Sequence, residues 1–186
     1  MPKIILLLLI IGLTTFSCKK EEILEETNLF YDNGSNTAPV LNTGTYEAMA
    51  RFPTSETNDF EGQNLEEIVF YLSDLPDQCE VIIYGEGTAT TPNTILYQSD
   101  VTNNLESSAW NSHTLSTPIA ITGEDIWIGV RLVHNSNIAS IGCDTGPANI
   151  NGDYLWADGD NTWMTFRERT EGEVNINWNI RGVIKE

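Results

Sequence analysis

Apolar and polar residues alternate in short runs from residue 29 to the end of the chain. Successive side chains of a β-strand point to opposite faces, so the alternation gives each strand one apolar and one polar face. The clearest runs are 125–132 and 174–180, and Trp178 is in phase with the apolar residues of the second run. No stretch of about 11–18 residues keeps the spacing of a helix with one apolar face. The pattern therefore predicts an all-β body.

Turn-forming residues separate these runs. Gly, Asn, Asp and Pro supply the backbone conformations that tight turns need, as at Asn33-Gly34 and Asp158-Gly159. About ten short strands with regular turns are typical of an antiparallel β-sandwich or a barrel. Further strands are predicted at 46–52, 68–72, 81–83, 94–98, 110–115, 119–121, 138–143, 154–156 and 163–166.

The first 17 residues are predicted to be a signal peptide. Lys3 supplies a positive start, and residues 4–13 form an apolar run of ten. Ten helical residues span about 15 Å, which is half the hydrocarbon core of a bilayer, so this run is too short for a transmembrane helix.

Cys18 follows small residues directly after this run, in an arrangement that resembles the lipobox of bacterial lipoproteins. The resemblance implies cleavage before Cys18 and acylation of its sulfur, and two or three acyl chains anchor a protein firmly to a membrane. Thr15 stands where the lipobox usually has Leu. The alternative is ordinary secretion with cleavage near Ser17.

Residues 18–28 are polar and charged and are predicted to be a solvated tether in front of a single domain at 29–186. Lys20-Glu21-Glu22 resembles the surface-export signal of Bacteroidota lipoproteins. That resemblance implies an outer-membrane protein exposed at the cell surface. The alternative is that these charges only keep the tether solvated.

The chain has 27 acidic and 9 basic residues, with a formal net charge of −18. Affinity for phosphates comes largely from Lys and Arg, so this charge argues against binding to nucleic acid or to an anionic lipid surface. The membrane is expected to be reached only through the N-terminal lipid. Hydrophobic residues make up 40% of the chain, which is a globular composition.

Three motifs of the body resemble those of a known group of modules. They are DIWIG at 125–129, DTGPA at 144–148 and NWNIR at 177–181, in that order. Over about residues 29–184, the chain resembles the jelly-roll accessory modules of secreted Bacteroidota proteins, including gingipain-type adhesin regions. The resemblance implies a jelly-roll-like antiparallel β-sandwich of about ten strands. It also implies a binding, adhesion or spacer role and leaves room for a structural calcium ion.

Two cysteines remain once Cys18 is acylated, and they are Cys79 and Cys143. Exported proteins fold in an oxidising compartment, so an even pair favours a disulfide. The bond would close a loop of 65 residues, which stabilises a fold by about 4 kcal/mol in the chain-entropy model. The alternative is a pair of buried free thiols on different strands.

Oxygen-bearing side chains gather between residues 144 and 161, where a calcium ion could be bound. Calcium takes six to eight oxygen ligands, which loops supply from carboxylates and backbone carbonyls. The alternative is that Asp, Asn and Gly simply form turns there. The predicted first ligands are Asp144, Asp153, Asp158 and Asp160, with Asp32 as an outside candidate.

Trp127 and Arg131 share the polar face of their predicted strand, while Trp156 and Trp163 flank the acidic loop. Exposed aromatic rings stack on sugar rings, and polar neighbours bind the hydroxyl groups, so these four residues are the predicted ligand-binding set. The alternative is that the tryptophans fill the core or cover an open edge, as Trp110 and Trp178 are expected to do. A polar row on the last strand is expected from Asn175, Asn177, Asn179 and Arg181.

Catalysis has little support in the sequence. The two histidines, His113 and His134, have no neighbouring pattern typical of a catalytic triad. We therefore expect a non-catalytic surface lipoprotein that binds a glycan or another extracellular ligand through a preformed β-surface. The main alternative is a structural or adhesion spacer, or a subunit of an envelope protein complex. A small hydrolase is the third hypothesis.

Overall fold

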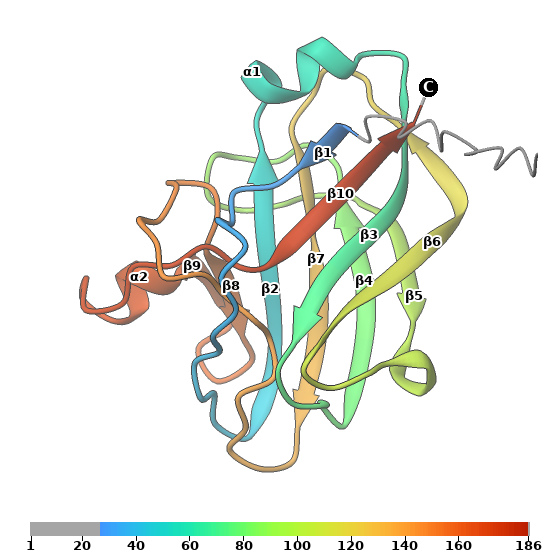
Figure 1. Cartoon of the computed structure of the whole chain (residues 1–186). Coiled ribbons are helices and arrows are strands. Elements are labelled where there is room, and N and C mark those ends of the chain that lie inside the picture. The colour runs from blue at the N-terminus through green and yellow to red at the C-terminus, as the bar shows by residue number, and fades with distance from the viewer. Residues whose placement is uncertain (1–26, 186) are drawn as a thin grey trace, which may run out of the picture.

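The computed structural model describes residues 27–185, so the predicted signal peptide, Cys18 and most of the tether lie outside the described residues. Two antiparallel sheets pack face to face in Figure 1, and together they contain ten strands. The predicted all-β sandwich of about ten strands is therefore confirmed. Within residues 27–185, no helix is long and apolar enough to cross a membrane.

The strand order in the smaller sheet is β1 (Thr27–Leu29), β10 (Ile180–Lys185), β3 (Asn64–Leu72) and β6 (Ala109–Ala120). The order in the larger sheet is β5 (Ile95–Asp100), β4 (Gln78–Tyr84), β7 (Ile126–His134), β2 (Gly44–Phe52), β8 (Tyr154–Ala157) and β9 (Thr162–Thr165). The helical turns are α1 (Thr54–Thr57), η1 (Asn58–Phe60), η2 (Thr102–Asn104) and α2 (Phe166–Arg169).

The strand pairs follow the order of a jelly roll. The first strand pairs with the last, β2 pairs with β7, β3 with β6, and β4 with β5. The chain thus behaves as one long hairpin wrapped around a core, which is the topology of a jelly roll of eight strands. The hairpin β8–β9 is inserted before β10 and extends the larger sheet beyond β2.

The core lies between the two sheets and follows the alternation of the sequence. The even-numbered residues of β7 from Ile126 to Leu132 face inward, as do Ile68, Phe70 and Leu72 of β3. Trp178 is fully buried in the same core, as predicted. Burying an apolar side chain of this kind stabilises the fold by roughly 1.5–3 kcal/mol, so the inward faces account for much of the stability.

Two predicted strands are not strands in the structure. The run 174–180 alternates like a strand, yet β10 begins only at Ile180. Asn177 and Asn179 are buried, and their side chains bind the loops at 144–149 and 33–36 instead of facing solvent as a polar row. The run 138–143 forms only isolated bridges to three different segments.

Gly129 of β7 allows β2 and β7 to lie close together. A Cβ atom at Gly129 would overlap the carbonyl oxygen of Ala48 and the sulfur of Met49. We expect Gly129→Ala to destabilise the protein by about 3 kcal/mol or more, because a backbone oxygen cannot move aside without breaking the sheet. Urea denaturation of purified protein measures this loss.

Gly159 is the matched control for this substitution. It lies in the β8–β9 turn, and a Cβ atom there would meet no atom within 4 Å. Gly159→Ala should leave the midpoint of unfolding unchanged. An equally small effect of Gly129→Ala would contradict the close approach of β2 and β7.

Candidate functional site

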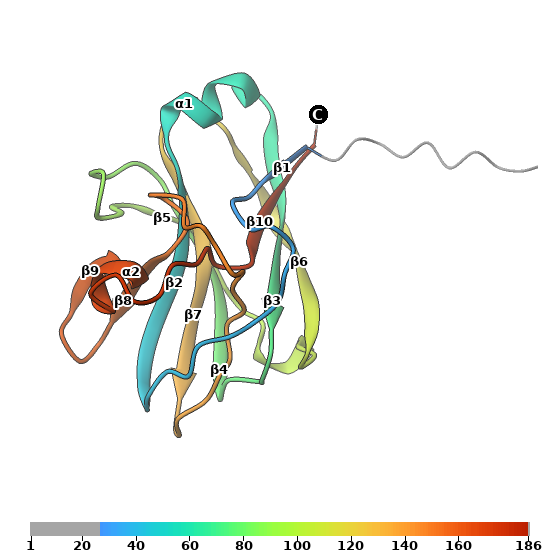
Figure 2. The same ribbon diagram turned by 60° about the vertical axis from the view of Figure 1, so that its left-hand side comes forward.

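The predicted platform residue Trp127 faces the outer side of the six-stranded sheet, as its phase requires, but it is fully buried. The ring centroids of Tyr154 and Trp163 lie 4.7 Å and 6.0 Å from that of Trp127. Tyr154 donates a hydrogen bond of 2.7 Å to the carbonyl of Ala89 in the loop between β4 and β5. In Figure 2 this loop and the β8–β9 hairpin lie on the same side of the sheet. The prediction that Trp127 is an exposed platform is therefore wrong.

Arg131, Trp156 and Trp163 do share a row with one another. Glu47 of β2 lies opposite Arg131 on one side and Trp156 on the other, and Trp156 lies opposite Trp163. Arg131 is held by Glu47 at 2.6 Å and by Glu80 at 3.2 Å, so each of its three guanidinium nitrogens already donates to a carboxylate. The polar groups of this row form their hydrogen bonds within the protein. The indole N–H of Trp156, for example, donates to Asn161 at 3.2 Å.

The four predicted calcium ligands are not brought together. Asp144 is buried and accepts four hydrogen bonds of 2.7–3.1 Å from N–H groups of Asn33, Gly146 and Asn177. Asp158 accepts from the backbone of Thr45, Asp160 pairs with Arg169 at 2.6 Å, and Asp153 accepts from the backbone of Arg167. Within residues 27–185, no three His, Cys, Asp or Glu side chains form a group that could hold a metal ion. These aspartates bind loops and turns, because their oxygens accept N–H groups that turns leave unpaired.

The predicted disulfide is absent, and Cys79 and Cys143 are both free and buried. Cys79 lies on β4 opposite Leu132. Cys143 lies in the connection between β7 and β8, where its backbone bridges Thr37 and Trp178 and its sulfur lies 3.2 Å from Thr37 Oγ1. Burial raises the pKa of the Cys79 thiol to about 12, so it stays neutral and packs as a small apolar side chain.

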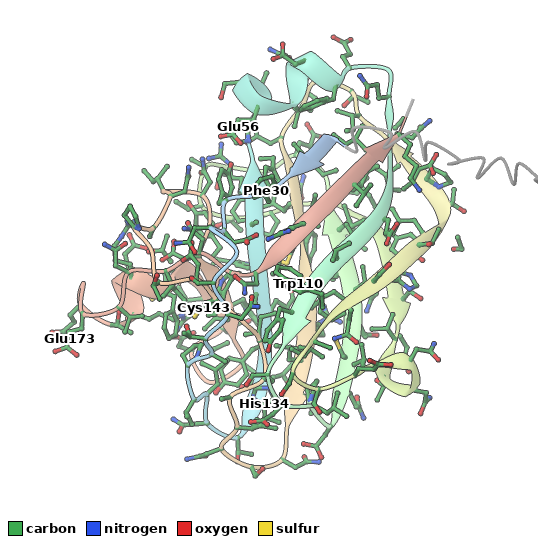
Figure 3. All side chains as sticks on the ribbon, viewed as in Figure 1. Phe30, Glu56, Trp110, His134, Cys143 and Glu173 are labelled. Atoms are coloured by element: carbon green, nitrogen blue, oxygen red, sulfur yellow. The ribbon has the colours of Figure 1, made fainter. Side chains whose placement is uncertain are left out.

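One exposed and two half-buried aromatic side chains, Phe30, Tyr71 and Trp110, gather on the outer face of the four-stranded sheet. The guanidinium of Arg181 lies 4.1 Å from the ring centroid of Trp110 and 5.2 Å from that of Phe30. Tyr71 meets Trp110 edge to face, with ring centroids 5.8 Å apart. Phe30 is 49% exposed, and Figure 3 shows Phe30 and Trp110 on this side of the molecule. We call Phe30, Tyr71, Trp110 and Arg181 the aromatic face.

Asp32 holds the centre of the aromatic face in place. Its buried carboxylate accepts from Arg181 Nη2 at 2.6 Å and Nε at 2.9 Å, and also from the backbone N–H of Gly34. A two-point bond of this type fixes the plane of a guanidinium. The third nitrogen, Nη1, makes no hydrogen bond to residues 27–185 and is left to donate to a ligand.

Sequence reasoning placed only part of the aromatic face. Arg181 was correctly expected on the polar side of its strand, and Trp110 was expected to be a core residue. The missed signal is the alternation along β6. Leu115 faces the core, and Trp110 is an odd number of residues away, so Trp110 faces the outer side of the sheet. Phe30 follows β1 in a loop, where alternation gives no direction.

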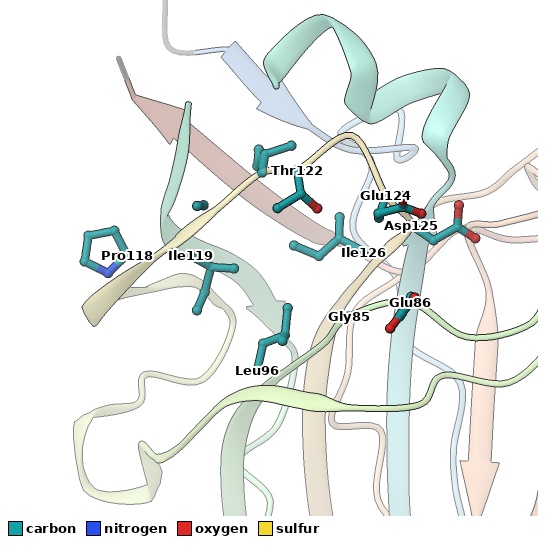
Figure 4. Close-up of a pocket in the computed structure, with 11 residues that line it drawn as sticks. Gly85, Glu86, Leu96, Pro118, Ile119, Thr122, Glu124, Asp125 and Ile126 are labelled. Carbon is teal, nitrogen blue, oxygen red and sulfur yellow. The ribbon is translucent and has the colours of Figure 1, made fainter. Parts of the chain in front are cut away.

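A cavity of about 470 Å³ lies at the open edge between β5 and β6. Figure 4 shows Leu96 and Ile119 on opposite sides of it and three acidic residues at its rim. The rim acids are Glu86, Glu124 and Asp125.

Asp153 is the one predicted ligand whose pKa is strongly raised, to about 6, because burial disfavours its charged form. The folded state therefore binds this proton more tightly than the unfolded state, and stability falls as the pH rises from about 4 to about 6. We expect Asp153→Asn to stabilise the protein at pH 7 by roughly 1–2 kcal/mol and to have little effect at pH 4. Urea denaturation at both pH values measures the difference.

Asp100→Asn is the control for this effect. Asp100 is exposed, and hydrogen bonds from Thr102 lower its pKa, so its removal should give no gain at pH 7. A pH profile of Asp153→Asn that matches the unmodified protein would exclude Asp153 as the source of the pH dependence.

Comparison with known proteins shows the fold. No protein-family model and no curated protein matches the chain. One similar solved structure is that of a clostridial cysteine protease, Cwp84, after propeptide cleavage, with 13% identity, a TM-score of 0.58, and coverage of 85% of this chain and 40% of that one. A second is a structure of "the cysteine protease and lectin-like domains of Cwp84, a surface layer associated protein of Clostridium difficile", with 15% identity, a TM-score of 0.54, and coverage of 78% and 33%. The chain thus spans well under half the length of these proteins and shares their fold over that part.

Proposed function

We propose that this protein is a non-catalytic module at the cell surface that binds a carbohydrate on the aromatic face. The observation that carries the proposal is the stack of Phe30, Arg181 and Trp110 on the outer side of the four-stranded sheet. Phe30 is half exposed beside the half-buried Trp110 and Tyr71, and contiguous apolar surface of this kind often marks a binding site. The corresponding side of the six-stranded sheet covers its aromatic residues with its own hairpin and loop.

The chemistry of the aromatic face fits a sugar. A pyranose ring has one apolar face of C–H groups and a rim of hydroxyl groups, so it packs on an aromatic ring while its rim forms hydrogen bonds. Phe30 offers the exposed ring, and Arg181 Nη1 offers a charged donor. Ser112 and Glu67 form a hydrogen-bonded pair on the neighbouring strands β6 and β3 and add further polar groups.

The fold supports this reading. One of the similar structures contains lectin-like domains of a surface layer associated protein. The sequence predicts a signal peptide that ends before Cys18, and we propose that the chain is anchored through that cysteine at the outer membrane and faces outward. Strand β1 begins at Thr27, inside the predicted tether of residues 18–28, and it is an edge strand of the four-stranded sheet.

The histidines support a role without catalysis. His134 accepts or donates a hydrogen bond of 2.7 Å with Ser140, but both side chains are buried, so a substrate cannot reach the serine. Burial also lowers the pKa of His134. His113 is engaged by Tyr97 at 2.8 Å. A hydrolase of the triad type needs an accessible nucleophile beside its base.

The test is a screen of purified protein against an array of neutral and acidic oligosaccharides, followed by calorimetry on the best binder. We expect Phe30→Ala and Trp110→Ala each to weaken binding tenfold or more, because each removes an apolar surface on which the sugar ring packs. Phe30 is half exposed, so its removal should not affect folding.

Val40→Ala serves as the control, since Val40 is an exposed apolar residue beside Leu41, which bridges Ile138 after β7. Its affinity should equal that of the unmodified protein. If no oligosaccharide on the array binds, the carbohydrate-binding proposal is refuted and the spacer or envelope-subunit hypothesis is favoured. Oligosaccharide binding that survives both aromatic substitutions would move the site away from the aromatic face.

A further inference from the structure

The cavity between β5 and β6 is separate from the aromatic face and has a different chemical character. Both strands are at the ends of their sheets, and they come together where Tyr97 of β5 bonds His113 of β6 at 2.8 Å. Beyond this bond the strands leave a space into which Leu96 and Ile119 point from opposite sides (Figure 4). The volume of about 470 Å³ is within the range of roughly 300–1,000 Å³ found for ligand sites.

The wall of this cavity is apolar and open to solvent. Ile121 and Ile126 of its lining are buried, while Leu96 is 44% exposed. An exposed leucine costs free energy in water, and a ligand that covers Leu96 with an apolar side chain would recover it.

The rim of the cavity carries negative charge that the protein does not neutralise. Asp125 is paired with Arg51 at 2.7 Å, whereas Glu86 and Glu124 are exposed and form no ion pair within residues 27–185. The basic residues of the described part are Arg51, Arg131, Arg167, Arg169, Arg181 and Lys185. All except Arg167 are paired with acids other than Glu86 and Glu124. Arg167 lies in α2, beyond the opposite edge of the larger sheet (Figure 1).

We propose that this cavity binds an extended segment of a partner protein that carries an apolar residue next to Lys or Arg. The apolar side chain fills the space between Leu96 and Ile119, and the basic side chain meets Glu86 and Glu124. An extended segment suits a site along the edges of two sheets, because chains of this form recurrently dock at sheet edges. The net charge of −18 also attracts a basic partner before contact.

The experiment titrates purified protein into fluorescently labelled Lys-Leu-Lys-Leu-Lys and measures anisotropy at low ionic strength. Two matched probes are Glu-Leu-Glu-Leu-Glu and Lys-Ser-Lys-Ser-Lys. We expect the first peptide to bind at least tenfold more tightly than either of the others, because only the first supplies both the apolar and the basic group. No preference for this peptide would overturn the proposal.

Variants separate the cavity from the overall charge of the protein. The double variant Glu86→Gln with Glu124→Gln and the single variant Leu96→Ser should each weaken binding tenfold or more. The matched control, Glu171→Gln with Glu173→Gln, removes the same charge from exposed sites in the turn after α2 and should bind as the unmodified protein does. Equal losses in both double variants would show that the peptide responds only to net charge, which also overturns the proposal.

All five altered residues are exposed, and a thermal melt of each variant confirms that it is folded. The test is independent of the carbohydrate proposal, since Phe30→Ala leaves this cavity intact and should not change peptide binding. A protein that binds the peptide but no oligosaccharide would retain this inference and lose the other.

Discussion

The pairing of β2 with β7 over nine consecutive residues is the constraint on which the other features depend. It fixes which residues of the central strands face inward and which face the outer side. The inward set forms the core with the smaller sheet, and the outward set is covered by the β8–β9 hairpin and the β4–β5 loop. The larger sheet is therefore buried on both sides near Trp127, whereas Phe30, beside the smaller sheet, is the aromatic residue of the described part that is exposed.

Alternation of apolar and polar residues was sufficient to predict most of the fold. It placed β2, β3, β4 and β7, and it oriented their side chains, because each of these strands has a buried and a less buried face. It failed at 174–180, where the same alternation arises for another reason. Asn177 and Asn179 of that run are turned inward and bind Asp144, Ser35 and Asn36, so these two polar positions belong to a buried network and do not face water. An Asn residue gives the same polar position in the sequence pattern whether its side chain faces water or a buried network.

The functional residues were harder to predict because alternation gives the face of a side chain and not what covers it. Trp127 is on the expected face, but the chain that covers it is about thirty residues away in sequence at Tyr154. The acidic loop illustrates a second limit, since carboxylates that could bind a cation instead accept backbone N–H groups of Asn33 and Gly146. The surroundings of the two cysteines also come from distant segments, with Cys79 opposite Leu132 and Cys143 beside Thr37, and both thiols are free. These outcomes depend on contacts between distant segments.

The pairing of the first and last described strands also has an architectural consequence. Thr27 lies opposite Ile184 in an antiparallel pair, so the polypeptide enters and leaves the body about 5 Å apart. A domain whose ends are this close can be inserted into a surface loop of an unrelated host without stretching either one. Both ends of the described body therefore lie together at the β1 edge of the four-stranded sheet, so a host would need only one attachment point to hold it.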